Sequence, residues 1–395
     1  MRLPAIQAAL REASIDGWLF YDHHHRDPLA YSILGLDPEM HVSRRWFYLI
    51  PAQGEPSKLL HSIESTRLDT LPGATTLYSS WQQLESALDS MLAPYCRVAM
   101  QYSPSSGILY VSMVDAGTIE LIRSLGKEVV SSAGLVARFQ AVLTQAQIDS
   151  HYAAQQRLDR ILAAAWPHIG HLARASSTDE FATAQWLSEA MRREGLTWEH
   201  GPNVSSGPNS ANPHYEPTSA SSRRIGPGDF VLIDIWAKLT TPDAIYYDIT
   251  WTGVVARPPT AHEQAIFTTV TAARDAVIAA VQSAYAAGEP IAGFQADDVA
   301  RGVIRDAGYA DYFTHRTGHN IGREIHGAGA HLDNLETHDT RLLLPNTCFS
   351  VEPGIYLPGT GAGGDAFGIR SEVNMITMPT EARVTGAIQT SLVSI

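Results

Sequence analysis

Five side chains in the second half of the chain have the types and surroundings that metal chemistry requires. They are four carboxylates and one imidazole, namely Asp234, Asp248, His319, Glu352 and Glu372. Each lies among apolar neighbours in a strand-like or turn-like segment, where carboxylates are rarely buried without a partner. Burying four carboxylates together costs too much free energy unless cations neutralise them. A set of oxygens with one nitrogen favours one or two divalent ions such as Mn²⁺, Co²⁺ or Zn²⁺.

Each of these residues alone also has an ordinary structural explanation. A salt bridge or a strand-end turn would account for Asp234, and a hydrogen-bonded loop would account for His319. Glu352 could simply mark the turn at the following proline and glycine. The combination of all five residues, and not any one of them, favours a metal centre.

The expected strands would bring these acids together. Asp248 and Thr250 share one face of a strand, because side chains alternate along it. A Thr-Thr-Pro-Asp turn signal lies between the two aspartate strands, so a hairpin would place Asp234 near Asp248. Arg370 and Glu372 are likewise expected to point to the same side of their strand.

The elements around these residues predict an α+β domain. Apolar spacing and capping signals predict helices at 148–165, 177–194, 260–287 and 295–307, with Pro167 ending or kinking the first. Apolar runs predict strands at 230–235, 246–255, 347–351 and 369–377. The glycine-rich run 359–364 is expected to be a turn between the two glutamate strands. Helices and largely antiparallel strands in this order are typical of the α+β class.

The first part of the chain reads as a separate α/β domain. Strands are expected at 18–21, 46–50, 59–60, 97–102 and 129–130, and the second and third of these are expected to form a hairpin. A length of 395 residues suggests two domains or three. We therefore expect an N-terminal α/β domain at 1–143 and a catalytic domain at 144–395.

Composition excludes several function classes. The formal net charge of −13 argues against nucleic-acid binding, which requires a basic face, and against docking on anionic lipid. The first 17 residues lack the apolar core of a signal peptide, and no apolar run approaches the roughly 18 residues of a membrane span. Two cysteines exclude a thiolate metal cage and a disulfide framework, and they fit a reducing compartment. A cytoplasmic protein is expected.

Several motifs in order along the chain resemble the pita-bread metallopeptidases, the family of methionine aminopeptidase, aminopeptidase P and prolidase. The resemblance rests on 229–234, 247–250, 315–322, His326, 351–356 and 369–372, and on the substrate-histidine segment around 212–215. These motifs cover about residues 200 to 378. The first domain resembles the smaller N-terminal domain of the aminopeptidase P and prolidase branch. The resemblance therefore implies a C-terminal pita-bread domain behind a smaller creatinase-like α/β domain.

The resemblance also implies a role for each candidate ligand. Asp234, Asp248, His319, Glu352 and Glu372 would bind two divalent ions, with Asp248 and Glu372 bridging them. Glu352 would also be the general base toward a hydroxide that bridges the ions. Manganese is the expected metal, with cobalt or zinc as alternatives, because hard oxygen ligands suit Mn²⁺.

Further residues would act on the substrate or on the ligands. His326 would hydrogen-bond the scissile carbonyl or its oxyanion, and His214 would line the pocket for the residue after the scissile bond. His315 precedes the histidine ligand by one helical-turn spacing and is expected beside the site. Tyr247 and Arg370 would orient the carboxylates.

The implied activity is metal-dependent hydrolysis of the Xaa-Pro bond, with Xaa-Pro dipeptides as the expected substrates. The alternative is an Xaa-Pro aminopeptidase acting on longer peptides. A creatinase-like hydrolase and a non-catalytic binding protein are disfavoured, because such relatives lack the metal ligands that this chain retains. Small proline-containing peptides and a second copy of the chain, in a homodimer, are the expected partners.

Some features depart from the resembled pattern or lie outside it. The two aspartates are 14 residues apart, Trp251 replaces a common arginine, and Val373 replaces a common acid, which suggests an atypical subgroup. The histidine tract at 23–25 is expected to be a solvated loop rather than a metal site. His331 and His338, in a polar loop, are expected at the surface.

Overall fold

The computed structural model describes residues 2–359 and 366–395. The chain divides into two compact units, Met1–Gln140 (unit 1) and Ala141–Ile395 (unit 2). Most of the glycine-rich run 359–364, expected to be a turn, lies outside the described residues.

Unit 1 is built on a mixed six-stranded sheet in the order β4-β3-β2-β1-β5-β6. Its elements are α1 (Leu3–Glu12), β1 (Gly17–Asp22), α2 (Pro28–Leu34), β2 (Trp46–Pro51), β3 (Ser57–His61), β4 (Ala74–Tyr78), α3 (Trp81–Leu92), β5 (Arg97–Met100), α4 (Ala116–Ser124), β6 (Glu128–Ser131) and α5 (Ala133–Val136). Strands β2 and β3 pair antiparallel, which confirms the expected hairpin. One face of the sheet packs its apolar side chains against α3 and α4.

Unit 2 contains longer helices and several sheets, whose strands pair antiparallel except for β17, which lies parallel to β10. Its elements are α6 (Gln145–Arg174), α7 (Glu180–Arg193), β7 (Leu196–Thr197), β8 (Asn203–Ser206), β9 (Phe230–Leu239), β10 (Tyr247–Val254), α8 (Ala261–Ala287), α9 (Gly293–Asp306), β11 (Asn320–Ile321), β12 (Cys348–Val351), β13 (Gly354–Leu357), β14 (Phe367–Arg370), β15 (Val373–Thr377), β16 (Ala382–Thr385) and β17 (Val393–Ser394). The first sheet has the strand order β17-β10-β9-β7, and β8 also pairs with β9. The second has the order β11-β12-β15-β16, and the third consists of β13 and β14. This arrangement is the expected α+β class.

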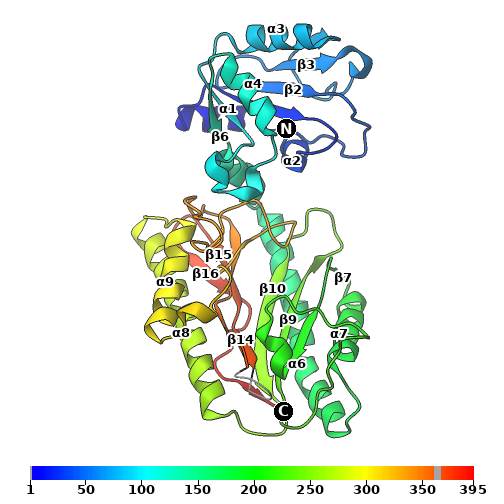
Figure 1. Ribbon diagram of the computed structural model, residues 1–395, viewed down its shortest axis with the longest axis vertical. Helices are drawn as coiled ribbons and strands as arrows, with labels where there is room; N and C mark the ends of the chain where they lie inside the picture. The colour runs from blue at the N-terminus through cyan, green and yellow to red at the C-terminus, as the bar shows by residue number, and fades with distance from the viewer. Residues whose placement is uncertain (1, 360–365) are drawn as a thin grey trace. The chain divides into compact units, whose positions relative to one another are not determined.

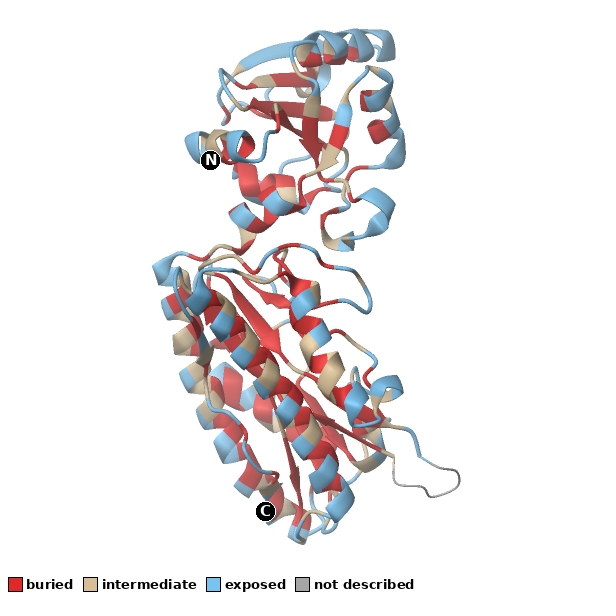
Figure 2. Ribbon diagram, turned by 90° about the vertical axis from the view of Figure 1, so that its left-hand side faces the viewer, coloured by how far each residue is buried: buried red, intermediate tan, exposed pale blue. Residues whose placement is uncertain are grey.

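Two helix pairs cover the strands of unit 2. Apolar residues of α6 and α7 pack against β8, β9 and β10. Apolar residues of α8 and α9 pack against β12 to β15 in a second cluster. Figure 1 shows α6 and α7 beside β9 and β10, and α8 and α9 beside β14 to β16. In Figure 2 the strands of unit 2 are buried almost throughout, while each helix alternates between a buried and an exposed face. The site therefore lies on strands that both helix pairs hold rigid.

Capping residues fix the starts of the long helices, at the predicted position for α8 and three residues before the predicted one for α6. The Thr144 hydroxyl accepts the Gln147 N–H before α6, and Thr260 and Glu263 form the equivalent capping box before α8. Gly288, in the left-handed conformation, ends α8. Of the two effects expected at Pro167, an end of the helix or a kink, the first is wrong, because α6 continues to Arg174. Pro167 lies on the exposed side of α6, where water can bond the carbonyl that loses its partner.

The strand expected at 369–377 is two strands that belong to different sheets. Strand β14 ends at Arg370, β15 begins at Val373, and they pair with β13 and β12 respectively. Ser371 and Glu372 form the break between them. An apolar run does not reveal a change of sheet, so the sequence predicts one strand.

One helix, α8, is long and apolar enough to be a candidate membrane span by length and composition. Its buried residues include Ile266, Val270, Val277 and the charged Arg274, and they belong to the core of unit 2. We therefore assign α8 as a core helix of unit 2.

Candidate metal centre

The hairpin of β9 and β10 places two of the candidate ligands. In its antiparallel register Asp234 pairs with Thr250, and Asp248 pairs with Trp236, so these four residues share one face. On the other face Ile235 and its neighbours pack against α6 and α7. Burial of the apolar face therefore turns both aspartates to the opposite side.

The pairing of β11 with β12 places the histidine and one glutamate. Ser350 on β12 accepts the backbone N–H of His319 through its hydroxyl at 2.9 Å, and donates that hydroxyl to Glu352 Oε1 at 3.0 Å. Gly318 passes so close to β12 that a Cβ there would lie 2.0 Å from the Ser350 carbonyl oxygen. Only glycine fits this position, which fixes the approach of His319.

The break between β14 and β15 places the last ligand. The Glu372 backbone N–H donates to the Thr250 carbonyl at 3.3 Å, and the Thr250 hydroxyl donates to Glu372 Oε2 at 2.7 Å. The guanidinium of Arg274, buried on α8, donates to the Ser371 hydroxyl at 2.6 Å and to the Gln389 carbonyl at 2.9 Å. The broken strand is therefore anchored from β10 and from α8.

The five candidate residues meet in one buried cluster. One ligand atom from each of Asp248, His319 and Glu372 lies within 4.8 Å of the others. The Nε2 atom of His319 is 3.5 Å from Asp248 Oδ2 and 3.3 Å from Glu352 Oε1. Asp234 joins through Arg370, whose guanidinium forms a very short ion pair with Asp234 Oδ2.

The tautomer of His319 shows that the cluster fits a cation. Nδ1 lies 3.3 Å from the Asn320 carbonyl, which can only accept, so Nδ1 carries the proton. Nε2 then presents a lone pair to the carboxylates of Asp248 and Glu352, and burial lowers the pKa of the ring well below its usual range. A lone pair facing two ionised carboxylates is repulsive, and a bound cation relieves this repulsion without protonating either acid.

Unbonded carboxylate oxygens support the same conclusion. Among the described residues, Asp234 Oδ1, Asp248 Oδ1 and Glu372 Oε1 are buried and have no hydrogen-bond partner. Burial, followed by the neighbouring acids, raises the pKa of Asp248 and Glu372 well above the ordinary range. Orphaned oxygens on crowded, buried acids are what hard divalent cations ligate.

Arg370 connects the acids to a chain of neutral groups. Its Nε donates to the Thr250 hydroxyl at 3.0 Å and one terminal nitrogen donates to Tyr356 Oη at 3.1 Å. Tyr356 in turn donates to His315 Nε2 at 2.8 Å, while His315 Nδ1 donates to the Arg316 carbonyl at 2.7 Å. Burial and the charge of Arg370 lower the pKa of His315 to about 3, so this ring stays neutral. Arg370 and His315 therefore lie beside the cluster, as expected.

The two candidate substrate histidines are exposed at the cluster. The rings of His326 and His319 meet edge to face with centroids 4.4 Å apart. The His214 backbone N–H donates to Asn212 Oδ1 at 3.1 Å, and its charge contributes to lowering the pKa of both His315 and His326. Among the described residues, neither the His214 ring nor the His326 ring has a hydrogen-bond partner, so both are available to a substrate.

The structure corrects two expectations. The Tyr247 hydroxyl donates to Asp159 on α6 at 2.8 Å, because strand alternation turns Tyr247 away from the face that carries Asp248. Tyr247 therefore connects the hairpin to α6 and does not orient the carboxylates. His331 is fully buried, and its Nδ1 accepts the backbone N–H of Asn320 at 3.1 Å. It positions the residue after the histidine ligand, whereas His338 is exposed as expected.

Sequence reasoning missed the groups that hold the ligand segments. Asp297 on α9 accepts the Thr317 N–H at 2.9 Å and the Thr317 hydroxyl at 2.6 Å, and so fixes the approach to His319. The Thr317 carbonyl accepts the Glu352 N–H at 2.8 Å. The apolar spacing of α9 would place Asp297 near the buried face of the helix. No sequence signal, however, distinguishes this aspartate as the one that holds the segment before His319.

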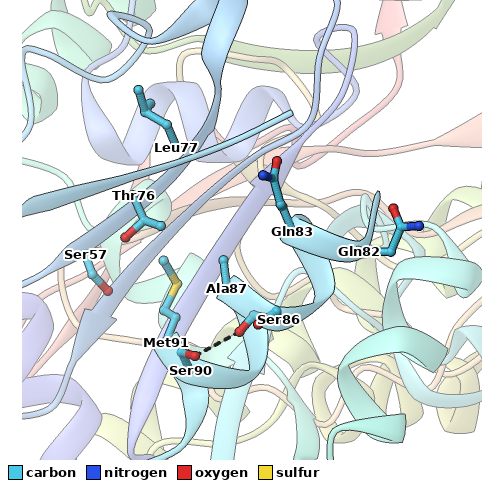
Figure 3. A pocket seen from close by; sticks show the side chains of 9 residues that line it. All are labelled: Ser57, Thr76, Leu77, Gln82, Gln83, Ser86, Ala87, Ser90 and Met91. Carbon is cyan, nitrogen blue, oxygen red and sulfur yellow. Dashed lines mark hydrogen bonds between the residues drawn. The ribbon is translucent and has the colours of Figure 1, made fainter. Parts of the chain in front are cut away.

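Unit 1 holds a separate, uncharged hollow of about 600 Å³ between α3 and the strands β3 and β4. Figure 3 shows its nine lining side chains, with the Ser90 hydroxyl bonded to the Ser86 carbonyl at 2.9 Å. None of the nine is an acid, a histidine or a cysteine. The histidines of the tract at 23–25 are half-buried or exposed, and no described metal-ligating group includes them.

Comparisons with known proteins agree with this geometry. The profile of metallopeptidase family M24 matches residues 150–377. A putative Xaa-Pro aminopeptidase of Mycoplasma pneumoniae is 32% identical over 183 residues, which are 46% of this chain and 48% of that protein. An Xaa-Pro dipeptidase of Lactobacillus delbrueckii subsp. lactis is 36% identical over 156 residues, 40% of this chain and 38% of that protein.

The crystal structure of dipeptidase PepE from Mycobacterium ulcerans superposes with a TM-score of 0.69 at 24% identity, covering 100% of this chain and 96% of that one. This likeness confirms the fold expected from the motifs. The sequence alignments, in contrast, span about half the length of the Mycoplasma relative or less.

Proposed function

The chain belongs to metallopeptidase family M24, and from this premise we propose that it hydrolyses the Xaa-Pro bond of dipeptides with divalent metal ions. Membership of a metallopeptidase family implies divalent metal, and the buried Asp248, His319 and Glu372 could hold it. The observation that carries the proposal is the bare Nε2 of His319 facing two carboxylates. That arrangement suits a divalent cation bound between the ring nitrogen and the carboxylates.

Five residues would hold two ions. The residues that would hold them are Asp234, Asp248, His319, Glu352 and Glu372, whose carboxylates and imidazole supply the oxygen and nitrogen donors. Manganese is the metal we propose, since four of the five ligands are hard oxygens. When bound, such ions supply Lewis acidity that activates a water molecule and polarises the scissile carbonyl.

The chain's own residues would move the protons and hold the substrate. Glu352 would accept a proton from the attacking water and deliver it to the proline nitrogen as the C–N bond breaks. The products are then the free carboxylate of Xaa and free proline. His326 would donate a hydrogen bond to the carbonyl oxygen as negative charge develops there. His214 would contact the proline side of the substrate.

The division of labour between the units belongs to the same proposal. The catalytic domain at 144–395 would carry out the chemistry, and the N-terminal domain at 1–143 would limit what enters. We also propose a cytoplasmic homodimer that acts on small proline-containing peptides.

A second candidate is an Xaa-Pro aminopeptidase, and the name of the Mycoplasma relative favours it. Hydrolysis of Ala-Pro and Ala-Pro-Pro by the manganese-loaded protein separates the two. A dipeptidase cleaves Ala-Pro with the higher kcat/KM. Much faster cleavage of the tripeptide would replace the dipeptidase assignment with the aminopeptidase one.

A further inference from the structure

One of the buried carboxylates outside the acid cluster belongs to Glu180, the first residue of α7. The Glu180 side chain is 0% exposed, and none of the ion pairs formed by the described residues includes it. An unpaired buried carboxylate persists only where hydrogen bonds replace its hydration. Glu180 therefore needs a structural reason for being where it is.

Five hydrogen bonds converge on its two oxygens. Oε1 accepts from the Ser206 N–H at 2.6 Å and from Asn209 Nδ2 at 3.0 Å. Oε2 accepts from Asn209 Nδ2 at 2.9 Å, from the Tyr215 hydroxyl at 2.6 Å and from the Arg223 N–H at 2.7 Å. All four donor residues belong to the segment 206–223, which we call the histidine segment because it carries His214.

The histidine segment has little regular structure of its own. After Ser206, the last residue of β8, and the short 3₁₀ turn at Gly207–Ala211, no helix or longer strand forms within it. Glu180 bonds it at both ends and at Tyr215, the neighbour of His214. Among the described residues the His214 ring has no hydrogen bond, so the position of the ring depends on the backbone of this segment.

The same segment contacts the acid cluster. The Pro213 carbonyl accepts from Arg370 at 3.4 Å, and the Ser210 hydroxyl accepts the Gly368 N–H at 2.9 Å. Arg370 is also the ion-pair partner of Asp234. The segment that carries His214 is thus fixed on one side by the cluster and on the other by Glu180.

We propose that Glu180 is a positioning residue for substrate binding, whose carboxylate fixes the histidine segment so that His214 meets the residue after the scissile bond. This inference rests on the proposed function. An amide cannot replace the carboxylate, because its NH₂ group would face hydrogen-bond donors. Glu180→Gln thus loosens the segment while keeping the shape of the side chain.

Steady-state kinetics with Ala-Pro test the proposal. For Glu180→Gln we expect KM to rise about tenfold with kcat and metal content nearly unchanged, since the lost interaction serves binding and not the chemical step. Combining it with His214→Ala should raise KM no further than His214→Ala alone, because both changes remove one function. If the effects of the two substitutions on KM are additive, or if KM is unchanged in Glu180→Gln, the proposal is overturned.

Glu263→Gln is the matched control. Glu263 is also a buried carboxylate in the first turn of a helix, where it accepts the Thr260 N–H and pairs with Arg257. Its substitution should lower Tm and leave KM unchanged. An equal rise of KM in both variants would mean general loosening and would refute the specific role. If Glu180→Gln does not fold, Tyr215→Phe removes one of the five bonds and should raise KM by a smaller factor.

Hydrogen–deuterium exchange separates this inference from the proposed function. In Glu180→Gln the amides of 206–223 should exchange at least about tenfold faster, while those of β9 and β10 stay protected. Unchanged exchange overturns the anchoring role whatever the activity. A wild-type protein that cleaves no Xaa-Pro peptide refutes the proposed function and the substrate role of Glu180 with it, while faster exchange would still establish the anchor.

Discussion

At the residue scale, the site is defined by carboxylate oxygens that lack hydrogen-bond partners among the described residues. In the part of the chain that the structure describes, Arg370 forms ion pairs with two of the four acids, Asp234 and Glu352, and three of the four keep a buried oxygen without a hydrogen-bond partner. The proton of the His319 ring is on Nδ1, so Nε2 presents a lone pair to the carboxylates of Asp248 and Glu352. Divalent cations in the site would balance the charge of these acids while leaving them ionised.

Glu352→Gln tests the base. The variant loses one ligand charge and the proton acceptor, so kcat for Ala-Pro should fall by about 10³-fold or more. The exposed Glu336, in the loop before β12, provides the control variant Glu336→Gln, which should keep wild-type kcat. A Glu352→Gln protein that keeps most of its kcat would remove this residue from the mechanism.

His326→Ala tests the oxyanion contact. Loss of one such donor typically costs about 10²- to 10³-fold in kcat. Bound metal, measured by elemental analysis, should be unchanged, because the group of side chains that could hold a metal among the described residues does not include His326. Exposed His338, changed to alanine, is the control. Loss of metal from His326→Ala would identify it as a ligand instead.

Residue types and spacing were sufficient to select the acids, but not to describe how they are supported. Strand alternation predicted that Asp248 and Thr250 share a face, and they do. The same rule, applied to Tyr247, would have turned it away from the ligands, so that error was avoidable. The burial of His331 was not predictable, because it depends on Asn320 and Asp339, which approach it only in the folded chain.

At the element scale, α6 supports the back of the hairpin. His151 is fully buried, its Nδ1–H donates to the Tyr246 carbonyl at 2.6 Å, and its Nε2 accepts from the Thr385 hydroxyl at 2.9 Å. It thereby ties α6 to the start of β10 and to β16. Burial lowers the pKa of this ring to about 4, so the folded protein holds it neutral.

Stability should therefore depend on the titration of His151. The unfolded chain binds its proton near pH 6.5 and the folded one only near pH 4, so stability is full above pH 6.5 and falls as the pH drops toward 4. The loss is about 3 kcal/mol, from 1.36 kcal/mol per pH unit. Denaturant unfolding of wild type and His151→Gln between pH 4 and 7 measures it.

The His151→Gln variant should lose the fall in stability between pH 6.5 and 4 that the titration of His151 causes. We also expect it to be less stable than the wild type at pH 7. His171→Gln, which changes an exposed histidine on the same helix, should keep it. Identical pH slopes for wild type and His151→Gln would contradict the account of a neutral, buried His151.

Element boundaries were predictable where local chemistry sets them. Capping at Thr260 and Gly288 bounded α8 correctly. The sequence could not decide whether Pro167 ends the helix, because the cost of a proline depends on which side of α6 faces water, a tertiary property. The break at Ser371 was missed for the same reason, since it arises from the bonds of Arg274 and Thr250 to residues distant in sequence.

At the scale of the whole molecule, the net charge of −13 overstates the negative charge of the metal-bound protein. Four of the acids lie in the cluster that divalent ions would neutralise. Binding to the folded state alone stabilises it by about 2.7 kcal/mol when free metal is 100 times its Kd. The free energy of unfolding of unit 2 should therefore increase when metal binds.

Removal of metal should lower Tm. Calorimetry after treatment with a chelator should show a lower unfolding temperature, and added Mn²⁺ should restore the original Tm. Asp248→Asn, which weakens the cluster, should shrink that shift. An identical Tm with and without Mn²⁺ in the wild-type protein would mean that the folded state does not bind this ion selectively.

The measurement that tests the central claim most directly is the hydrolysis of Ala-Pro and Ala-Ala by chelated protein, before and after Mn²⁺ is restored. The account predicts no cleavage of either dipeptide by the chelated protein, and cleavage of Ala-Pro well above Ala-Ala once Mn²⁺ returns. Equal cleavage of Ala-Pro with and without metal, or none after Mn²⁺, Co²⁺ and Zn²⁺ have each been tried, would contradict it.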